Sequence, residues 1–177
     1  MSRTNPNKKK RRQANKTLLI FGEGLGEAIF LKHLRKLYSF SSDVKIKIKK
    51  GRGGDVKSII IDASKILGAF DRRIVVLDND NKLKKEMLEA RQEAKKRKIE
   101  IIENTPCLES LFLLILGEKQ NVKNSPWCKK KFQSEYMTKI KPSKLNEYDK
   151  LFPKTLLNSK RLKITVLNKL ILIMEGK

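Results

Sequence analysis

Short apolar runs alternate along this chain with longer segments in which apolar residues recur every three or four positions. The short runs predict strands, and the recurring positions predict helices. Strands are expected at 17–21, 44–49, 72–77 and 98–102, and helices at 28–38, 56–67, 83–97 and 106–116. Lysine alternates strictly with apolar residues at 44–49, which predicts a strand near a sheet edge with one wet, basic face. Such alternation of strand and helix is typical of an α/β fold with a mainly parallel, Rossmann-like sheet flanked by helices.

Three regions follow from this pattern. Residues 1–16 have almost no apolar content and are expected to form a disordered basic arm. Residues 17–118 are expected to form the α/β domain. Residues 119–177 are basic and mostly helical in character, and are expected to pack on the same domain as an extension. The apolar stretch 162–174 should dock into the core or a partner.

Two carboxylates stand directly after the strand that ends at Leu77. Asp78 and Asp80 are separated by one residue, so an extended backbone would point both side chains the same way. The carboxyl end of a strand is also where an open α/β sheet places its ligand crevice. Hard oxygen ligands converging there suit Mg²⁺. The alternative is that Asp-Asn-Asp-Asn forms only a polar turn.

The charge of the chain points to a polyanionic partner. Lys and Arg total 42 against 19 Asp and Glu, giving a formal net charge of +23. The acidic residues gather in the α/β domain, whereas both flanking regions are strongly basic. A basic periphery around an acidic centre is typical of an enzyme that acts on nucleic acid. The residues expected to contact phosphates are Lys8, Lys9, Lys10, Arg11, Arg12, Arg52, Lys129, Lys130 and Lys131.

Several further segments of the sequence allow a structural or a functional interpretation. The glycine-bearing loop 51–55 is either a tight turn with Asp55 capping the next helix or a phosphate-binding loop. The basic arm is either a phosphate-attracting segment or a solvated tail. His33 lies among lysines and arginines and is expected at the surface. Trp127, Phe132 and Tyr136 share a helix face, which favours core packing over base stacking.

Other classes of protein are disfavoured. Cys107 and Cys128 show no CxxC spacing, so a Cys/His zinc site is not expected. No apolar run approaches the roughly 20 residues of a membrane span, and the few cysteines favour a soluble, cytoplasmic protein without a membrane partner.

Two motifs in order resemble a Toprim domain, a metal-dependent nuclease and nucleotidyl-transfer module. The first is the strand followed by Gly22-Glu23-Gly24-Leu25-Gly26-Glu27, and the second is the strand that ends in Asp78-Asn79-Asp80. The first motif is similar to that of OLD-type Toprim nucleases. The 51–55 loop, together with Pro106-Cys107-Leu108-Glu109 before a run of leucines, resembles small RloB-like Toprim proteins.

The resemblance implies a function and a site. Glu23 would act as general acid/base or metal ligand, and Asp78 and Asp80 as ligands of Mg²⁺ or Mn²⁺. Glu27 and Glu109 would be supporting or second-metal carboxylates. The implied activity is metal-dependent phosphodiester hydrolysis in DNA or RNA, in prokaryotic or phage defence. A second copy of the chain or an activating protein is a further expected partner.

Two rival functions stay open. One is a non-catalytic nucleic-acid-binding protein that keeps the Toprim fold. The other is a receiver-like phospho-acceptor domain, which is disfavoured because no later strand-end lysine can be placed.

Overall fold

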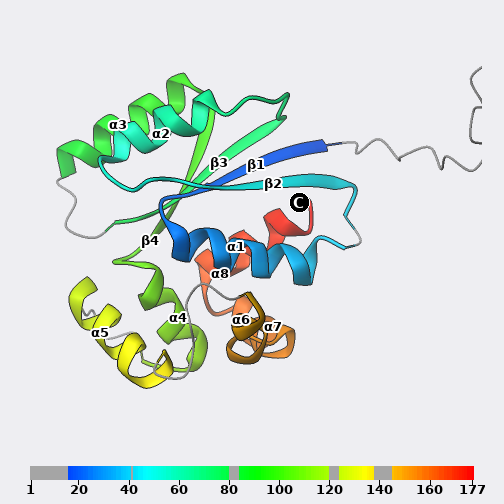
Figure 1. Cartoon of the computed structure of the whole chain (residues 1–177), viewed down its shortest axis with the longest axis vertical. Coiled ribbons are helices and arrows are strands. Elements are labelled where there is room, and N and C mark those ends of the chain that lie inside the picture. Colours follow the sequence, from blue (N-terminus) through cyan, green and yellow to red (C-terminus); the bar gives the residue numbers. More distant parts are fainter. Residues whose placement is uncertain (1–15, 41, 80–83, 120–123, 138–144) are drawn as a thin grey trace, which may run out of the picture.

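The computed structural model contains a four-stranded, all-parallel sheet flanked by helices, which confirms the predicted α/β, Rossmann-like fold class (Figure 1). The structure describes residues 16–40, 42–79, 84–119, 124–137 and 145–177. The strands are β1 (Lys16–Gly22), β2 (Val44–Lys50), β3 (Arg72–Asp78) and β4 (Ile99–Asn104). The helices are α1 (Leu25–Tyr38), α2 (Val56–Lys65), α3 (Lys84–Lys96), α4 (Leu108–Leu116), α5 (Ser125–Tyr136), α6 (Leu145–Leu151), α7 (Lys154–Arg161) and α8 (Thr165–Met174).

The order of the strands, β2-β1-β3-β4, contains a switch in direction. The chain leaves β1 toward β2 on one side, whereas it leaves β3 toward β4 on the other. Helix α1 lies on one face of the sheet, and α2 and α3 lie on the opposite face, as crossovers of one hand require (Figure 1). In open α/β sheets the ligand crevice lies outside the carboxyl ends of the strands at such a switch point. Here that point lies between the ends of β1 and β3.

Burial along each strand follows its place in the sheet. β1 and β3 are interior, and their successive side chains contribute to hydrophobic clusters on both faces. Ile74 belongs to the cluster on the α1 face, and Val75 belongs to the cluster on the α2 and α3 face. β2 lies at an edge and buries only Ile46 and Ile48, so the alternation in the sequence correctly predicted an edge strand.

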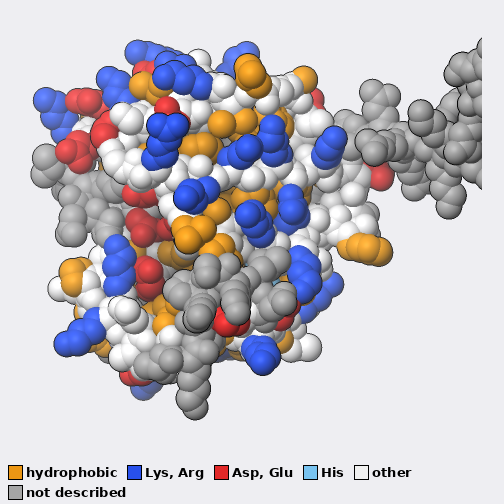
Figure 2. Space-filling view, in the orientation of Figure 1, with side chains coloured by type: hydrophobic (Ala, Val, Ile, Leu, Met, Phe, Trp, Pro, Cys, Tyr) orange, Lys and Arg blue, Asp and Glu red, His pale blue; other side chains and the backbone are white. Residues whose placement is uncertain are grey.

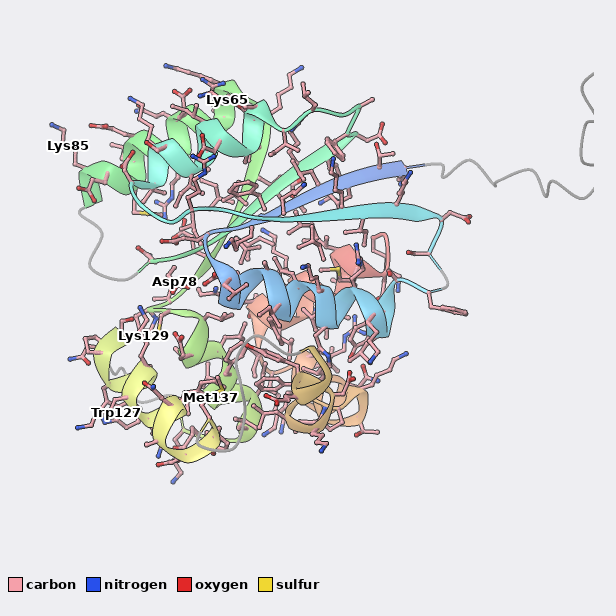
Figure 3. The ribbon with its side chains drawn as sticks, in the orientation of Figure 1. Lys65, Asp78, Lys85, Trp127, Lys129 and Met137 are labelled. Carbon is pink, nitrogen blue, oxygen red and sulfur yellow. The ribbon has the colours of Figure 1, made fainter. Side chains whose placement is uncertain are left out.

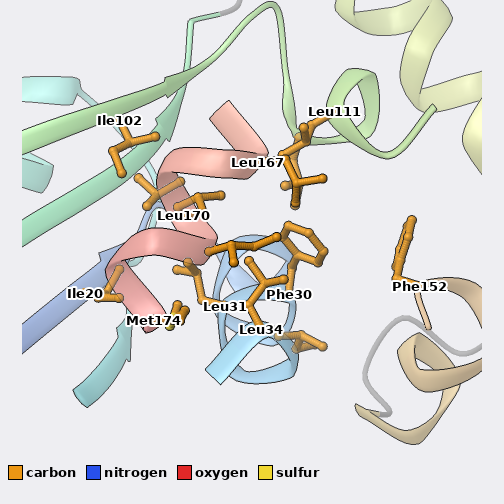
Figure 4. Packing of buried hydrophobic residues seen from close by; sticks show 14 of the residues in the cluster. Ile20, Phe30, Leu31, Leu34, Ile102, Leu111, Phe152, Leu167, Leu170 and Met174 are labelled. Atoms are coloured by element: carbon orange, nitrogen blue, oxygen red, sulfur yellow. The ribbon is translucent and has the colours of Figure 1, made fainter. Parts of the chain in front are cut away.

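The larger cluster joins α1 and β-sheet residues to the C-terminal helices (Figure 4). In α8, Leu167, Leu170 and Met174 are at most 1% exposed, as expected from the apolar stretch. The Phe30 ring packs edge-to-face against Phe112, with centroids 4.9 Å apart, and against Phe152 at 5.7 Å. The C-terminal helices therefore complete the core beneath the sheet.

Two expectations about single side chains were wrong. His33 is fully buried, because the chain around Phe152 covers it: Nε2 donates to Phe152 O (2.8 Å), and Nδ1 lies 3.3 Å from Asp149 Oδ1. Burial lowers the pKa of His33 and favours its neutral form. Trp127 is 39% exposed and has Lys131 Nζ 5.5 Å from its ring centroid, whereas Phe132 is buried as expected.

The packing of Phe30 gives a test of this core. Phe30→Ala should lower the free energy of unfolding by about 3–5 kcal/mol, because it removes a buried aromatic side chain and leaves a cavity. Phe40→Ala is the matched control; Phe40 is 98% exposed, so its loss should change stability by less than about 0.5 kcal/mol. Urea denaturation measures both, and equal midpoints for the two variants would contradict the packing described.

Candidate active site

Two carboxylates meet where β1 and β3 end. Asp78 is the last residue of β3 and is 8% exposed, and Glu23 directly follows β1. The Asp78 backbone N–H donates to Glu23 Oε2 (3.0 Å), and the Glu23 backbone N–H donates to Val76 O (3.0 Å). Figure 3 shows Asp78 on the side of the molecule where α5 carries Lys129 and Trp127. The switch point of the sheet thus joins the two residues that the sequence singled out on separate strands.

Asp78 is held from two further elements. Its Oδ1 accepts from Asn104 Nδ2 (3.2 Å) and from the backbone N–H of Leu108 (2.9 Å). Asn104 ends β4 and is 1% exposed, and Leu108 begins α4. Sequence analysis missed Asn104, although its place at the carboxyl end of a strand next to β3 could have indicated it.

Two more carboxylates surround this pair. Glu27 lies in the first turn of α1, is 8% exposed, and accepts the backbone N–H of Gly24 at Oε2 (2.8 Å). Glu109 lies half-buried in the first turn of α4. The positive end of a helix dipole stabilises a negatively charged side chain in the first turn. It can therefore stabilise both carboxylates without a bound cation.

The crowding of these acids changes their protonation. Burial, followed by the charge of Glu27, raises the pKa of Asp78 to about 7; Glu109 and Glu23 add to the rise, and the Asn104 hydrogen bond opposes it. Burial also raises the pKa of Glu27, with smaller contributions from Glu23 and Glu109. Figure 2 shows acidic side chains gathered between the sheet and α5, with Lys and Arg side chains around them. A cation placed among these carboxylates would relieve their repulsion.

The glycine-bearing loop 51–55 lies at the same end of the sheet as Glu23 and Asp78. The Gly51 N–H donates to Gly22 O (2.7 Å), and the Gly53 N–H donates to Glu23 O (3.1 Å). A Cβ added at Gly51 would lie 2.6 Å from Glu23 O, so this close approach requires glycine. The loop brings the exposed Arg52 beside the Glu23 turn.

Asp55 ends this loop and caps α2, as predicted. It accepts the Ser58 N–H at Oδ2 (3.0 Å), an N-cap contact that also lowers the pKa of Asp55.

The predicted lysines of α5 differ in their surroundings. Lys129 and Lys130 are exposed, whereas Lys131 forms ion pairs with Glu118 (3.3 Å) and Glu135 (3.0 Å). Asp80 and the residues Lys8, Lys9, Lys10, Arg11 and Arg12 lie outside the described residues.

The donor set can be compared with what a metal needs. Within the described residues, which exclude 80–83, no three His, Cys, Asp or Glu side chains form a group that could hold a metal ion. Mg²⁺ is commonly bound through only one or two carboxylates, with water and substrate phosphate completing its shell. Asp78 with Glu23 meets that smaller requirement in chemical type. Cys107 is buried, and burial raises the pKa of its thiol to about 12, so the thiol is protonated in the metal-free protein.

The fold and this edge define a class: parallel α/β proteins with carboxylates clustered at the switch point of the sheet. The family model for RloB-like proteins matches residues 18–170, so the chain belongs to the RloB-like family. No curated protein and no solved structure matches the chain significantly. Among the described residues, no helix is both long enough and apolar enough to span a membrane.

The raised pKa of Asp78 predicts a pH-dependent stability. The folded value of about 7 exceeds the ordinary value of 3.8, so the folded protein binds the extra proton between these values. Without divalent metal, the free energy of unfolding should therefore fall as the pH rises from about 4 to about 7. Asp78→Asn keeps an acceptor at Oδ1 and should flatten this fall and make the protein more stable than wild type at pH 8.

The control is Asp62→Asn, which changes an exposed aspartate of α2. Its stability profile should follow the wild type. Urea denaturation with EDTA at several pH values measures all three proteins, and a profile of Asp78→Asn that is parallel to that of the wild type would contradict the assignment.

Proposed function

We propose that this RloB-like protein is a metal-dependent nuclease of the Toprim type that hydrolyses phosphodiester bonds in DNA or RNA. The observation that carries the proposal is the contact between Glu23 and Asp78 at the switch point of the sheet. These are the positions at which the Toprim-like motifs place carboxylates. The formal charge of +23 supports a polyanionic substrate.

The proposed metal is Mg²⁺ or Mn²⁺, held by Asp78 and Glu23 together with Asp80. When bound, it would supply charge neutralisation at the scissile phosphate and at the leaving oxygen. Glu27 and Glu109 add negative charge around that position, which favours a cation. Asp78 and Glu23 are thus suited in chemical type to a hard, oxygen-seeking ion.

The chain's own residues have distinct tasks in this proposal. The Asp78 N–H fixes one oxygen of Glu23, so the Glu23 carboxylate is presented at the sheet edge for proton transfer to or from water. Asn104 and the start of α4 hold one oxygen of Asp78, which sets the direction of the other. The loop with Arg52 adds a cation beside Glu23 that can contact a substrate phosphate.

A non-catalytic nucleic-acid-binding function is the second candidate, and one observation favours it. Asp78 Oδ1 accepts the Leu108 N–H at the start of α4, which is also what a purely structural aspartate would do. In that case the carboxylates would organise the fold, and the basic surface alone would bind nucleic acid.

Cleavage assays with matched variants separate the two candidates. The substrates are single- and double-stranded DNA and RNA, each with Mg²⁺, Mn²⁺ or EDTA. The wild type should cleave at least one substrate in metal and none in EDTA. Asp78→Asn should abolish turnover, and Glu23→Gln should lower it by about 10²–10⁴-fold, the usual cost of removing a general acid/base.

Glu89→Gln is the control, because Glu89 is an exposed carboxylate of α3 away from the sheet edge. Its activity should equal that of the wild type. Full activity in Asp78→Asn would refute the catalytic assignment. Metal-independent binding of nucleic acid by the wild type, without cleavage of any substrate, would support the binding-protein candidate instead.

A further inference from the structure

Three lysines form a straight row on the edge strand β2. Lys45, Lys47 and Lys49 are exposed, whereas the alternating Ile46 and Ile48 are buried against the α1 side of the sheet. Side chains two residues apart on a strand point to the same face and are separated by about 6.6 Å along it. The row therefore spans about 13 Å with one positive charge at each step. Figure 2 shows Lys and Arg side chains over the part of the surface crossed by β2.

No described helix covers this face of β2. Helix α2 packs on β3, α3 packs on β4, and α1 packs on the opposite face of β2. In the sheet, β1 separates β2 from β3 and β4, the strands on which α2 and α3 pack. All three lysines are exposed, so a ligand can reach each of them.

The middle lysine is positioned by an aromatic ring. Lys47 Nζ lies 5.5 Å from the centroid of the Phe70 ring, and the Arg73 guanidinium lies 5.0 Å from the same centroid. Arg73 is itself fixed by hydrogen bonds to Ile66 O (3.0 and 3.1 Å). Cation–π contacts of this kind orient a lysine without neutralising its charge.

The row of lysines runs toward the end of the sheet where Glu23 and Asp78 lie. In the register of the sheet Lys50 is level with Gly22, and Glu23 follows Gly22 in the chain. The Gly51–Gly53 segment then hydrogen-bonds to the Gly22 and Glu23 carbonyls, which brings Arg52 to the end of the row. A chain of phosphates that follows the lysines would thus arrive beside Glu23 and Asp78.

We propose that the sugar-phosphate backbone of a single-stranded nucleic acid lies along Lys45, Lys47 and Lys49 and enters the Glu23–Asp78 edge from there. This proposal rests on the proposed function, because it names the form of that site's substrate. The spacing of the lysines is comparable to that of consecutive phosphates in an extended strand, so each lysine can contact one phosphate. Double-stranded B-DNA matches less well. Over three consecutive phosphates, one of its strands turns by about 70° around the helix axis, so these phosphates follow a straight row less closely.

Two other roles for these lysines would give different experimental results. Charged residues on an edge strand can serve only to prevent pairing with another sheet. Alternatively, β2 could pair with β2 of a second copy, although its Ile46 carbonyl already accepts a hydrogen bond from the Arg35 guanidinium (3.0 Å). Repulsion between facing lysines also opposes such a pair.

The test compares two triple variants of the full chain with equal changes in charge. The first is Lys45→Gln/Lys47→Gln/Lys49→Gln; the control is Lys85→Gln/Lys95→Gln/Lys96→Gln, three exposed lysines of α3. Fluorescence anisotropy measures binding of short single-stranded DNA, single-stranded RNA and duplex DNA in EDTA over a series of KCl concentrations. EDTA prevents any metal-dependent cleavage, so binding is measured separately from catalysis.

The β2 variant should lower the slope of log K against log[KCl] by about 2 for a single strand, since each lost phosphate contact contributes about 0.7. Near 0.1 M salt this corresponds to roughly 100-fold weaker binding. The α3 control should bind nearly as the wild type does.

Several results would overturn the proposal: no single-strand binding by the wild type, equal losses in the two triple variants, or a loss confined to duplex DNA. Aggregation of the β2 variant with unchanged affinity would assign the lysines to edge protection. A change from dimer to monomer in sedimentation would assign them to a second copy. Wild-type binding along the row without any cleavage in Mg²⁺ or Mn²⁺ would leave the path standing and remove the proposed function.

Discussion

The hydrogen bond from the Asp78 backbone N–H to the Glu23 carboxylate ties together the two strands on which the rest of the site depends. It can form because β1 and β3 are neighbours and because their connections leave in opposite directions. Helices α1 and α3 then lie on opposite faces of the sheet (Figure 1). Asn104 from β4 and the start of α4 hold Asp78 from the other side. The switch in direction between β1 and β3 therefore sets the positions of Glu23, Asp78 and Asn104.

The clustering of these acids raises the pKa values of Asp78 and Glu27. A buried aspartate with a pKa of about 7, beside a buried glutamate whose pKa is also raised, destabilises the charged, metal-free protein. Such groups persist at functional sites more often than in purely structural ones. The excess of lysine and arginine lines β2 and the surrounding surface, where it can attract a polyanion toward the acidic cluster.

Local sequence patterns predicted the elements of the fold and the pair at its centre. Alternating Lys and Ile residues placed β2 at an edge, and apolar runs placed β1 and β3 in the interior. Strand-end position and the family-like motif predicted Glu23 and Asp78. The contact of Asn104 with Asp78 and the burial of His33 were not predicted, because both depend on which distant segments pack together. No short-range pattern shows that the chain around Phe152 covers one side of α1.

A calorimetric titration of Mn²⁺ into wild type and Asp78→Asn tests whether these carboxylates hold a metal ion, because it measures binding of the ion without requiring a substrate or an activator. We expect a saturable heat signal for the wild type that is lost or strongly weakened in Asp78→Asn, whose fold is verified by circular dichroism. Proton release should accompany binding near pH 7, since the cation displaces the proton from the carboxylate cluster. Identical titrations of the two proteins, or no binding by the wild type, would contradict the assignment of these carboxylates to a metal.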